Sequence, residues 1–173
     1  MERLKFESGR PLPDEFLLEL GRMTAMWPRL EFGLDLVIGR LMGFDLHDVR
    51  PVIAFAHANF QQRVEVFSTL CNRMQANHSQ LKNYKSVLTK IQGAQKGRNK
   101  YAHNVITPNS SGKMVVTPIA ARDVFKMVPE PVYLNDIKEV TAKILEAAGA
   151  LHSLVIQVQD INSNPEVKNS EAT

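Results

Sequence analysis

Cysteine is almost missing from this chain, and long apolar runs are missing altogether. Cys71 is the only cysteine in 173 residues, so an internal disulfide and a cysteine-based zinc site are both excluded. No apolar run approaches the roughly 20 residues that a membrane-spanning helix needs. Residues 1–7 lack the apolar segment of a secretion signal. These absences predict a cytoplasmic protein without a membrane partner.

The sequence also lacks the short motifs of several enzyme classes. Its glycines are scattered, so no glycine-rich phosphate loop is present. There is no His-Glu-x-x-His arrangement for a metal and no Gly-x-Ser-x-Gly turn for a serine nucleophile. Cys71 lies in an apolar helical pattern, where a thiol is usually inert. No metal and no cofactor are expected.

The bulk composition is that of an ordinary globular domain. The chain is 44% hydrophobic, and its length suits one domain with a sizeable core. A net charge of +3 permits a nucleic-acid partner but does not by itself predict one. Any statement about function must therefore come from local patterns.

A long helix is predicted near the start of the chain. From Phe16 to Leu41, apolar residues alternate at steps of four and three, which is a heptad-like seam. The pattern predicts a helix over about residues 14–42, with Gly43 as its stop. Pro28 lies inside this helix and removes one backbone donor, so a kink or break is expected there.

Further helices are predicted downstream. Residues 45–57 favour a short helix or turn. Asn59 is a suitable N-cap for a helix over residues 60–74, and residues 75–80 are typical of a polar loop. The next helix is predicted over residues 81–105, because apolar residues again gather on one face.

The pattern changes after that helix. Residues 108–112 form a turn cluster between two β-prone runs, 104–107 and 113–117, which predicts a hairpin. Residues 122–128 are expected to add a third short strand. A last long helix is predicted from about Asn135, where apolar residues again recur at steps of three and four.

These elements predict a mainly α fold, a four- to five-helix bundle with a small β-hairpin insert before the last long helix. A single domain is expected over residues 1–160, with the insert at about residues 104–128. The composition then turns polar, so residues 161–173 are expected to form a disordered tail.

The most informative segment is residues 98–103, with the sequence Arg-Asn-Lys-Tyr-Ala-His. On a helical wheel, Arg98 projects from the middle of the apolar face, while the lysines spread over the opposite face. A guanidinium in that position needs a partner, because an unpaired buried charge is very costly. Asn99 and His103 lie four residues apart, so they share one side of the helix at the border of its apolar face.

Structural roles for these residues stay open beside functional ones. Arg98 suits a core or interface carboxylate, such as that of Glu31 or Asp35, as an ion-pair partner. His103 suits a histidine that stabilises a helix end through the helix dipole. The nearby lysines suit a solvated face.

Residues 98–103 resemble the motif of the HEPN superfamily (higher eukaryotes and prokaryotes nucleotide-binding). Members of that superfamily are small helical bundles with an Arg-(four to six residues)-His motif near the end of a late helix. A polar residue, commonly Asn, follows the arginine. The early helix from Trp27 to Leu41, with Glu31 on its flank, is similar to that of bacterial members. The resemblance covers residues 14–160 in architecture and implies an HEPN-like bundle, but in chemistry it covers residues 98–103 only.

Spacing alone does not identify the motif. Three other Arg–His pairs have a matching separation: Arg40–His47, Arg50–His57 and Arg73–His78. Context distinguishes the segment 98–103, because it carries the Asn, lies in a strongly amphipathic helix, has its arginine on the apolar face and precedes a predicted hairpin.

The resemblance implies a metal-independent endoribonuclease of a bacterial defence or toxin–antitoxin-type system, with the motifs of a homodimer facing one cleft. RNA carries its own nucleophile, the 2′-hydroxyl, so no metal is obligatory. In that role His103 is a general acid or base, and Arg98 stabilises the charge that builds on the phosphorane. Asn99 orients His103 or donates to the phosphate, and Lys96 and Lys100 guide the RNA backbone.

A regulatory or antitoxin protein is implied as a further partner, because unrestrained RNA cleavage harms a cell. Two other functions stay open. One is a non-catalytic HEPN-like module that binds a protein or a nucleotide, in which Arg98 and His103 serve the dimer seam. The other is a plain dimerisation protein with no site. Glu31 is a candidate functional partner of Arg98 as well as a structural one.

Overall fold

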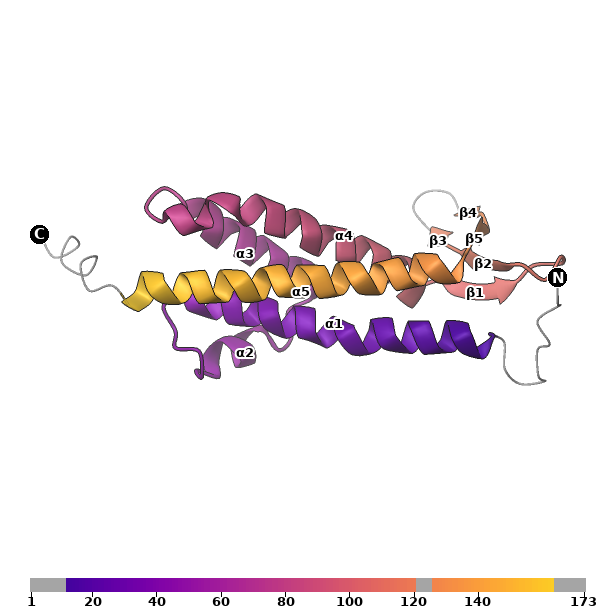
Figure 1. Ribbon diagram of the computed structural model, residues 1–173, viewed down its shortest axis with the longest axis horizontal. Helices are drawn as coiled ribbons and strands as arrows, with labels where there is room; N and C mark the ends of the chain where they lie inside the picture. The colour runs from indigo at the N-terminus through magenta and orange to yellow at the C-terminus, as the bar shows by residue number, and fades with distance from the viewer. Residues whose placement is uncertain (1–11, 121–125, 164–173) are drawn as a thin grey trace, which may run out of the picture. The chain divides into compact units, whose positions relative to one another are not determined.

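The computed structural model describes residues 12–120 and 126–163, which form five α-helices, one 3₁₀ helix and five short strands (Figure 1). In chain order the elements are α1 (Asp14–Leu41), α2 (Arg50–Phe55), α3 (Phe60–Met74), η1 (Ser79–Asn83), α4 (Tyr84–Ala102), β1 (Val105–Pro108), β2 (Met114–Thr117), β3 (Ile119–Ala120), β4 (Lys126–Met127), β5 (Glu130–Pro131) and α5 (Leu134–Ser163). The predicted fold class is confirmed: the chain is mainly helical, with a small antiparallel sheet before the last long helix. None of the described helices is both long and apolar enough to cross a membrane.

The described residues divide into two compact units. One, which we call the motif unit, comprises the described residues of 12–27 and 92–144. The other, which we call the helical unit, comprises residues 28–91 and 145–163. Helices α1, α4 and α5 are each divided, with one part in the motif unit and the other part in the helical unit. The single domain expected over residues 1–160 stays a prediction.

Helix α1 confirms the predicted seam, and it is not broken at Pro28, whereas a kink there stays a prediction. Seven seam positions are buried: Phe16, Met23, Trp27, Leu30, Leu34, Val37 and Leu41. The helix continues through Pro28, which is exposed. The carbonyl that loses its donor belongs to the exposed Thr24, where water can replace the missing hydrogen bond. Buried seam residues on both sides of the proline stabilise the helix enough to keep it continuous.

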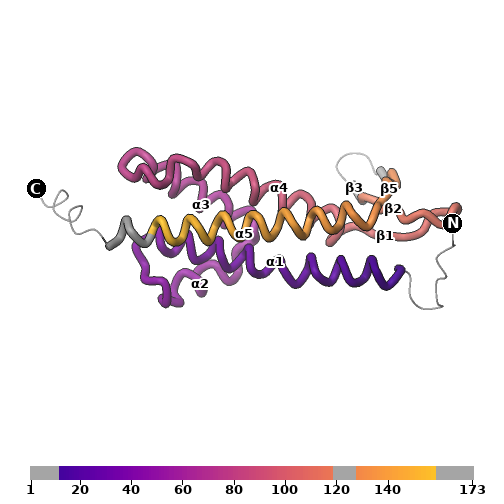
Figure 2. Tube along the Cα trace, in the orientation of Figure 1, coloured from indigo at the N-terminus to yellow at the C-terminus, as the bar shows by residue number. Residues whose placement is uncertain are grey.

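The helical unit is built from α2, α3, η1 and the adjoining parts of the long helices. Asn59 caps α3 as predicted: its side chain accepts from the backbone N–H of Gln62 at 3.0 Å, and the Gln62 side chain accepts from the Asn59 N–H at 3.0 Å. Helix α3 and the first part of α4 lie side by side (Figure 2), and the Tyr84 hydroxyl contacts Asn72 Oδ1 at 3.3 Å. The short helix predicted between residues 45 and 57 is α2.

The motif unit contains the predicted hairpin. Strands β1 and β2 pair antiparallel from Val105 opposite Thr117 to Pro108 opposite Met114. The turn between them is closed by Asn109, whose N–H donates to the Lys113 carbonyl at 2.8 Å. Gly112 has a φ of +76°, a left-handed conformation that favours glycine. The hairpin therefore follows directly from the turn cluster in the sequence.

The predicted helix over residues 81–105 is wrong at both ends. Residues 79–83 form the 3₁₀ helix η1, and α4 begins at Tyr84 and ends at Ala102. At its C-terminal end, the Asn104 side chain donates to the Lys100 carbonyl at 2.9 Å and satisfies a group that has no helical partner. Strand pairing from Val105 onward then prevents further helix.

The strands after the hairpin differ from the prediction. Of the strand expected over residues 122–128, residues 121–125 lie outside the described residues, and β4 pairs with β3 in a separate two-stranded sheet. The third strand of the main sheet is β5, which pairs with β2. Helix α5 extends to Ser163, beyond the predicted start of the tail, and residues 164–173 lie outside the described residues.

Candidate functional site

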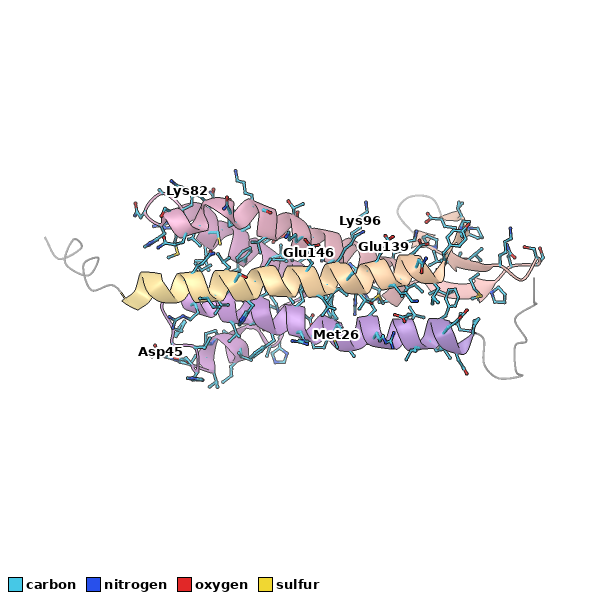
Figure 3. The ribbon with its side chains drawn as sticks, in the orientation of Figure 1. Met26, Asp45, Lys82, Lys96, Glu139 and Glu146 are labelled. Atoms are coloured by element: carbon cyan, nitrogen blue, oxygen red, sulfur yellow. The ribbon has the colours of Figure 1, made fainter. Side chains whose placement is uncertain are left out.

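The predicted site lies in the motif unit, at the C-terminal end of α4. Arg98 and Asn99 belong to the last turns of this helix, and His103 follows its last residue directly. A close approach between α4 and α5 fixes the position of this turn. A Cβ atom added to Gly97 would lie 2.8 Å from Cγ2 of Val140, so only glycine fits there without a shift. Figure 3 labels Lys96 and Glu139, which come from these two adjoining helices.

The side chain of Arg98 lies in contact with the side chains of both Asn99 and His103. Nη1 of Arg98 lies 2.7 Å from Nε2 of His103 and 3.3 Å from Oδ1 of Asn99. A guanidinium nitrogen only donates, so Nε2 of His103 accepts this hydrogen bond. In this arrangement the lone pair of Nε2 is occupied by the hydrogen bond from Arg98. The histidine can therefore act as a general base at Nε2 only after Arg98 has exchanged this hydrogen bond for another.

The indole of Trp27 on α1 is the third partner of Arg98. The guanidinium carbon lies 5.2 Å from the centroid of the Trp27 ring, which is a cation–π distance. Trp27 is only 6% exposed, so its ring also belongs to the core. Sequence reasoning missed its role as a partner of Arg98. The signal that could have revealed this role is the requirement that Arg98 find a partner on the apolar face. An aromatic ring can meet that requirement as well as a carboxylate can.

The carboxylates considered as partners of Arg98 belong to the helical unit. Asp35 is ion-paired with Arg63, with Oδ2 of the carboxylate 2.8 Å from Nη1. Glu31 is a neighbour whose charge contributes to a raised pKa of Asp35, after the larger effects of burial, which raises it, and of Arg63, which lowers it. An interaction between Glu31 and Arg98 stays a prediction.

One edge of the Arg98 guanidinium is unused. Within residues 12–120 and 126–163, neither Nε nor Nη2 of Arg98 makes a hydrogen bond, because all its hydrogen bonds come from Nη1. Two parallel N–H groups on one edge match the spacing of two oxygens in a phosphate or carboxylate. Arg98 is half-buried, whereas Asn99 and His103 are exposed. The site can therefore bind an oxyanion beside an accessible imidazole.

The two lysines predicted to guide RNA have different surroundings. Lys96 is exposed. Nζ of Lys100 lies 2.7 Å from Oε2 of Glu130 on β5, and this hydrogen bond raises the pKa of Lys100. Tyr101, which follows Lys100 in the chain, is buried, and burial raises the pKa of its hydroxyl. The positive charge of Lys100 is thus partly neutralised, while that of Lys96 is accessible.

The other Arg–His pairs with matching spacing have different environments. Arg40 is buried and donates to the Phe44 carbonyl at 3.1 Å. Arg50 forms an ion pair with Asp48. No hydrogen bond joins Arg73 to His78, both of which lie in the described ranges. The context that favoured the segment 98–103 in the sequence thus corresponds to a real contact between its arginine and its histidine.

Other chemistry at described residues is limited. Cys71 is fully buried, and burial raises the pKa of its thiol to about 12, so it does not form a thiolate near neutral pH. No three His, Cys, Asp or Glu side chains of the described ranges gather as ligands for a metal ion.

Comparison of the chain with protein-family models, with curated proteins and with solved structures finds no match. The resemblance to the HEPN superfamily therefore depends on residues 98–103 and on the mainly helical fold alone.

Proposed function

We propose that this chain is a metal-independent endoribonuclease of the HEPN type, acting in a bacterial defence or toxin–antitoxin-type system. One observation carries the proposal: Nη1 of Arg98 donates to Nε2 of His103 at 2.7 Å, while the Nε–Nη2 edge of the same guanidinium is unused. A base and an oxyanion donor are thereby adjacent, which is the minimum for transesterification of RNA.

The proposed reaction uses the 2′-hydroxyl of RNA as the nucleophile. His103 accepts the hydroxyl proton at Nε2, the 2′-oxygen attacks the adjacent phosphorus, and the bond from phosphorus to the 5′-oxygen breaks. The 5′-oxygen takes a proton from water, and the hydroxide that remains takes the proton from Nε2 of His103, which restores the imidazole. The products are therefore a 2′,3′-cyclic phosphate and a 5′-hydroxyl. Arg98 binds the non-bridging oxygens as charge builds on them. When Nη1 of Arg98 turns to a phosphate oxygen, its hydrogen bond to His103 is lost. Nε2 of His103 is then available to accept the proton of the 2′-hydroxyl.

The proposal includes a homodimer. Two-fold symmetry would bring two Arg98–His103 pairs to one cleft and double the positive potential that attracts RNA. Exposed Lys96 adds to this potential, whereas Lys100 contributes less because Glu130 partly neutralises it.

A cleavage assay tests the enzyme directly. Purified protein should cut RNA equally with and without EDTA, leave a 2′,3′-cyclic phosphate, and spare an oligonucleotide that lacks 2′-hydroxyls. His103→Ala should lower the cleavage rate by roughly 10²- to 10⁴-fold, and Arg98→Ala by roughly 10²- to 10³-fold. Unchanged thermal unfolding would show that both variants remain folded.

The chain supplies its own control for this assay. Arg73 and His78 have the same spacing as Arg98 and His103, but no hydrogen bond joins them within the described residues. Arg73→Ala and His78→Ala should therefore leave cleavage unchanged. If all four alanine variants cleave like the parent protein, the RNA is being cut by a contaminant and the proposal is wrong.

A regulatory protein partner also belongs to the proposal, since an unrestrained ribonuclease damages its own cell. Expression of the chain alone should slow growth, and His103→Ala should relieve the effect. Equal toxicity of the parent and this variant would argue against RNA cleavage as its cause.

A second candidate is a non-catalytic HEPN-like module that binds a protein or a nucleotide. The same hydrogen bond favours it, because the Nε2 lone pair that a base needs is occupied by Arg98. In that case no RNA is cut, and Arg98→Ala lowers the unfolding temperature or dissociates the dimer. The assay above and a measurement of molar mass separate the two candidates.

A further inference from the structure

Among the residues that the structure describes, Trp27 is the one hydrogen-bond or ring partner of Arg98 that lies outside residues 98–103. Asn99 and His103 are neighbours of Arg98 in the chain, whereas Trp27 comes from α1. The contact joins two helices of the motif unit through a buried ring and a half-buried cation. Trp27 is the single tryptophan of the chain, so no other indole contributes to the tryptophan fluorescence of the protein.

The contact with Trp27 becomes important when a ligand competes for the guanidinium. A phosphate that takes Nη1 removes the hydrogen bonds to Asn99 and His103, which are the only hydrogen bonds of Arg98 among the described residues. The cation–π contact is an attraction between the charge of the guanidinium and the face of the indole ring, and it requires no hydrogen bond, so it persists while the N–H groups turn to the ligand. Without it, the long arginine side chain must lose its rotamer freedom on binding.

We propose that Trp27 is a positioning residue, whose indole face holds the Arg98 guanidinium in place to bind an RNA phosphodiester after His103 has been released. This inference rests on the proposed function, because it names the group that supports its phosphate-binding arginine. Trp27 touches neither the RNA nor the reacting atoms in this role.

Three variants separate a positioning ring from ordinary core packing. Trp27→Phe keeps an aromatic face, and Trp27→Leu keeps an apolar side chain without one. Met23→Ala is the matched control, because Met23 is 1% exposed on the same helix and in the same unit, so its truncation leaves a cavity. Met23 is not one of the hydrogen-bond or ring partners that Arg98 has among the described residues. Unfolding temperatures of all three show how much stability each change removes.

Binding of a 2′-O-methyl oligoribonucleotide, which has no nucleophile, is the main measurement. Its dissociation constant should rise roughly 3- to 30-fold in Trp27→Leu, the range that a cation–π contact predicts. The constant should change little in Trp27→Phe and in Met23→Ala. Equal weakening by Trp27→Leu and Met23→Ala would show that the ring acts only through packing, and would overturn the proposal.

Fluorescence of the single tryptophan gives a second readout that needs no catalysis. Arg98→Ala should alter the emission of Trp27 in the free protein, and it should abolish the emission change that the oligonucleotide causes. Lys96→Ala should leave the emission of the free protein unchanged. Trp27 emission that does not respond to Arg98→Ala would mean that the contact is absent, which also overturns the inference.

The outcomes distinguish this inference from the function on which it rests. If the oligonucleotide binds with the expected Trp27 dependence and RNA is not cut, Trp27 keeps its positioning role and the ribonuclease is rejected. If RNA is cut and Trp27→Leu binds the oligonucleotide like the parent protein, the ribonuclease stands and the role of Trp27 is rejected. If the oligonucleotide does not bind at all, both fall.

Discussion

Asp35 is a buried carboxylate of the helical unit whose burial is incompletely compensated. It is 5% exposed, and its Oδ1 has no hydrogen bond to any described residue. Oδ2 accepts from Nη1 of Arg63 at 2.8 Å, and the same guanidinium donates to the carbonyls of Phe55 and Ala58. Burial raises the pKa of Asp35 to about 6, although the charge of Arg63 opposes this. The pair therefore connects α1 to the end of α2 without stabilising the charged carboxylate fully.

We predict that Asp35 makes the protein more stable as the pH falls from 7 to 4. Its pKa is about 6 when folded and 3.8 in the absence of the fold, so in this window the folded state holds a proton that the unfolded state releases. The free energy of unfolding therefore rises on acidification, by at most on the order of 3 kcal/mol from this residue. Asp35→Asn removes the effect. Urea unfolding of both proteins should be measured between pH 4 and 7. The free energy of unfolding of the parent protein, relative to that of Asp35→Asn, should increase as the pH falls. An equal pH dependence in the two proteins would refute this assignment.

At the scale of an element, α4 contains two glycines with opposite surroundings. A Cβ at Gly97 would lie 2.8 Å and 3.2 Å from the two Cγ atoms of Val140, whereas a Cβ at Gly93 would meet nothing within 4 Å. Both glycines weaken an isolated helix by roughly 0.5–1 kcal/mol relative to alanine. The difference between the stability changes that alanine causes at Gly97 and at Gly93 therefore measures how closely α4 and α5 approach beside Arg98.

Gly93→Ala should stabilise the protein by roughly 0.5–1 kcal/mol, because only the helix propensity changes. Gly97→Ala should destabilise it by roughly 1 kcal/mol, since overpacking against Val140 costs about 1–3 kcal/mol and outweighs the same gain. Chemical denaturation measures both values. In the Val140→Ala background, Gly97→Ala should become much less harmful, and a penalty that persists there would show that Val140 is not its cause.

Elements were predictable from the sequence wherever a local pattern determines them. The seam of α1, the cap at Asn59 and the hairpin turn at Gly112 all depend on residues close in the chain, and all three are present. Strand β5 and the end of α4 were missed, because pairing with β2 and the side chain of Asn104 decide them. The contact of Trp27 with Arg98 was missed for the same reason, as 71 positions of chain separate the two residues.

At the scale of the whole molecule, the contacts of Arg98 with His103, Asn99 and Trp27 all form within one chain and one unit. Arg98, Asn99, His103 and Trp27 all belong to the motif unit, and their contacts need no second copy. A homodimer would therefore contain two complete Arg98–His103 pairs. This differs from a shared site, in which one protomer supplies the arginine and the other the histidine.

Mixed dimers decide between these two arrangements. We predict that a dimer of one Arg98→Ala chain and one His103→Ala chain, isolated through two different affinity tags, does not cleave RNA, because neither chain keeps the contact between Arg98 and His103. A dimer of one parent chain and one chain with both substitutions should keep about half the activity of the parent dimer, since one complete pair remains. Restored cleavage in the first dimer would show that the residues act across the interface. Failure to recover any doubly tagged species would instead refute the homodimer itself.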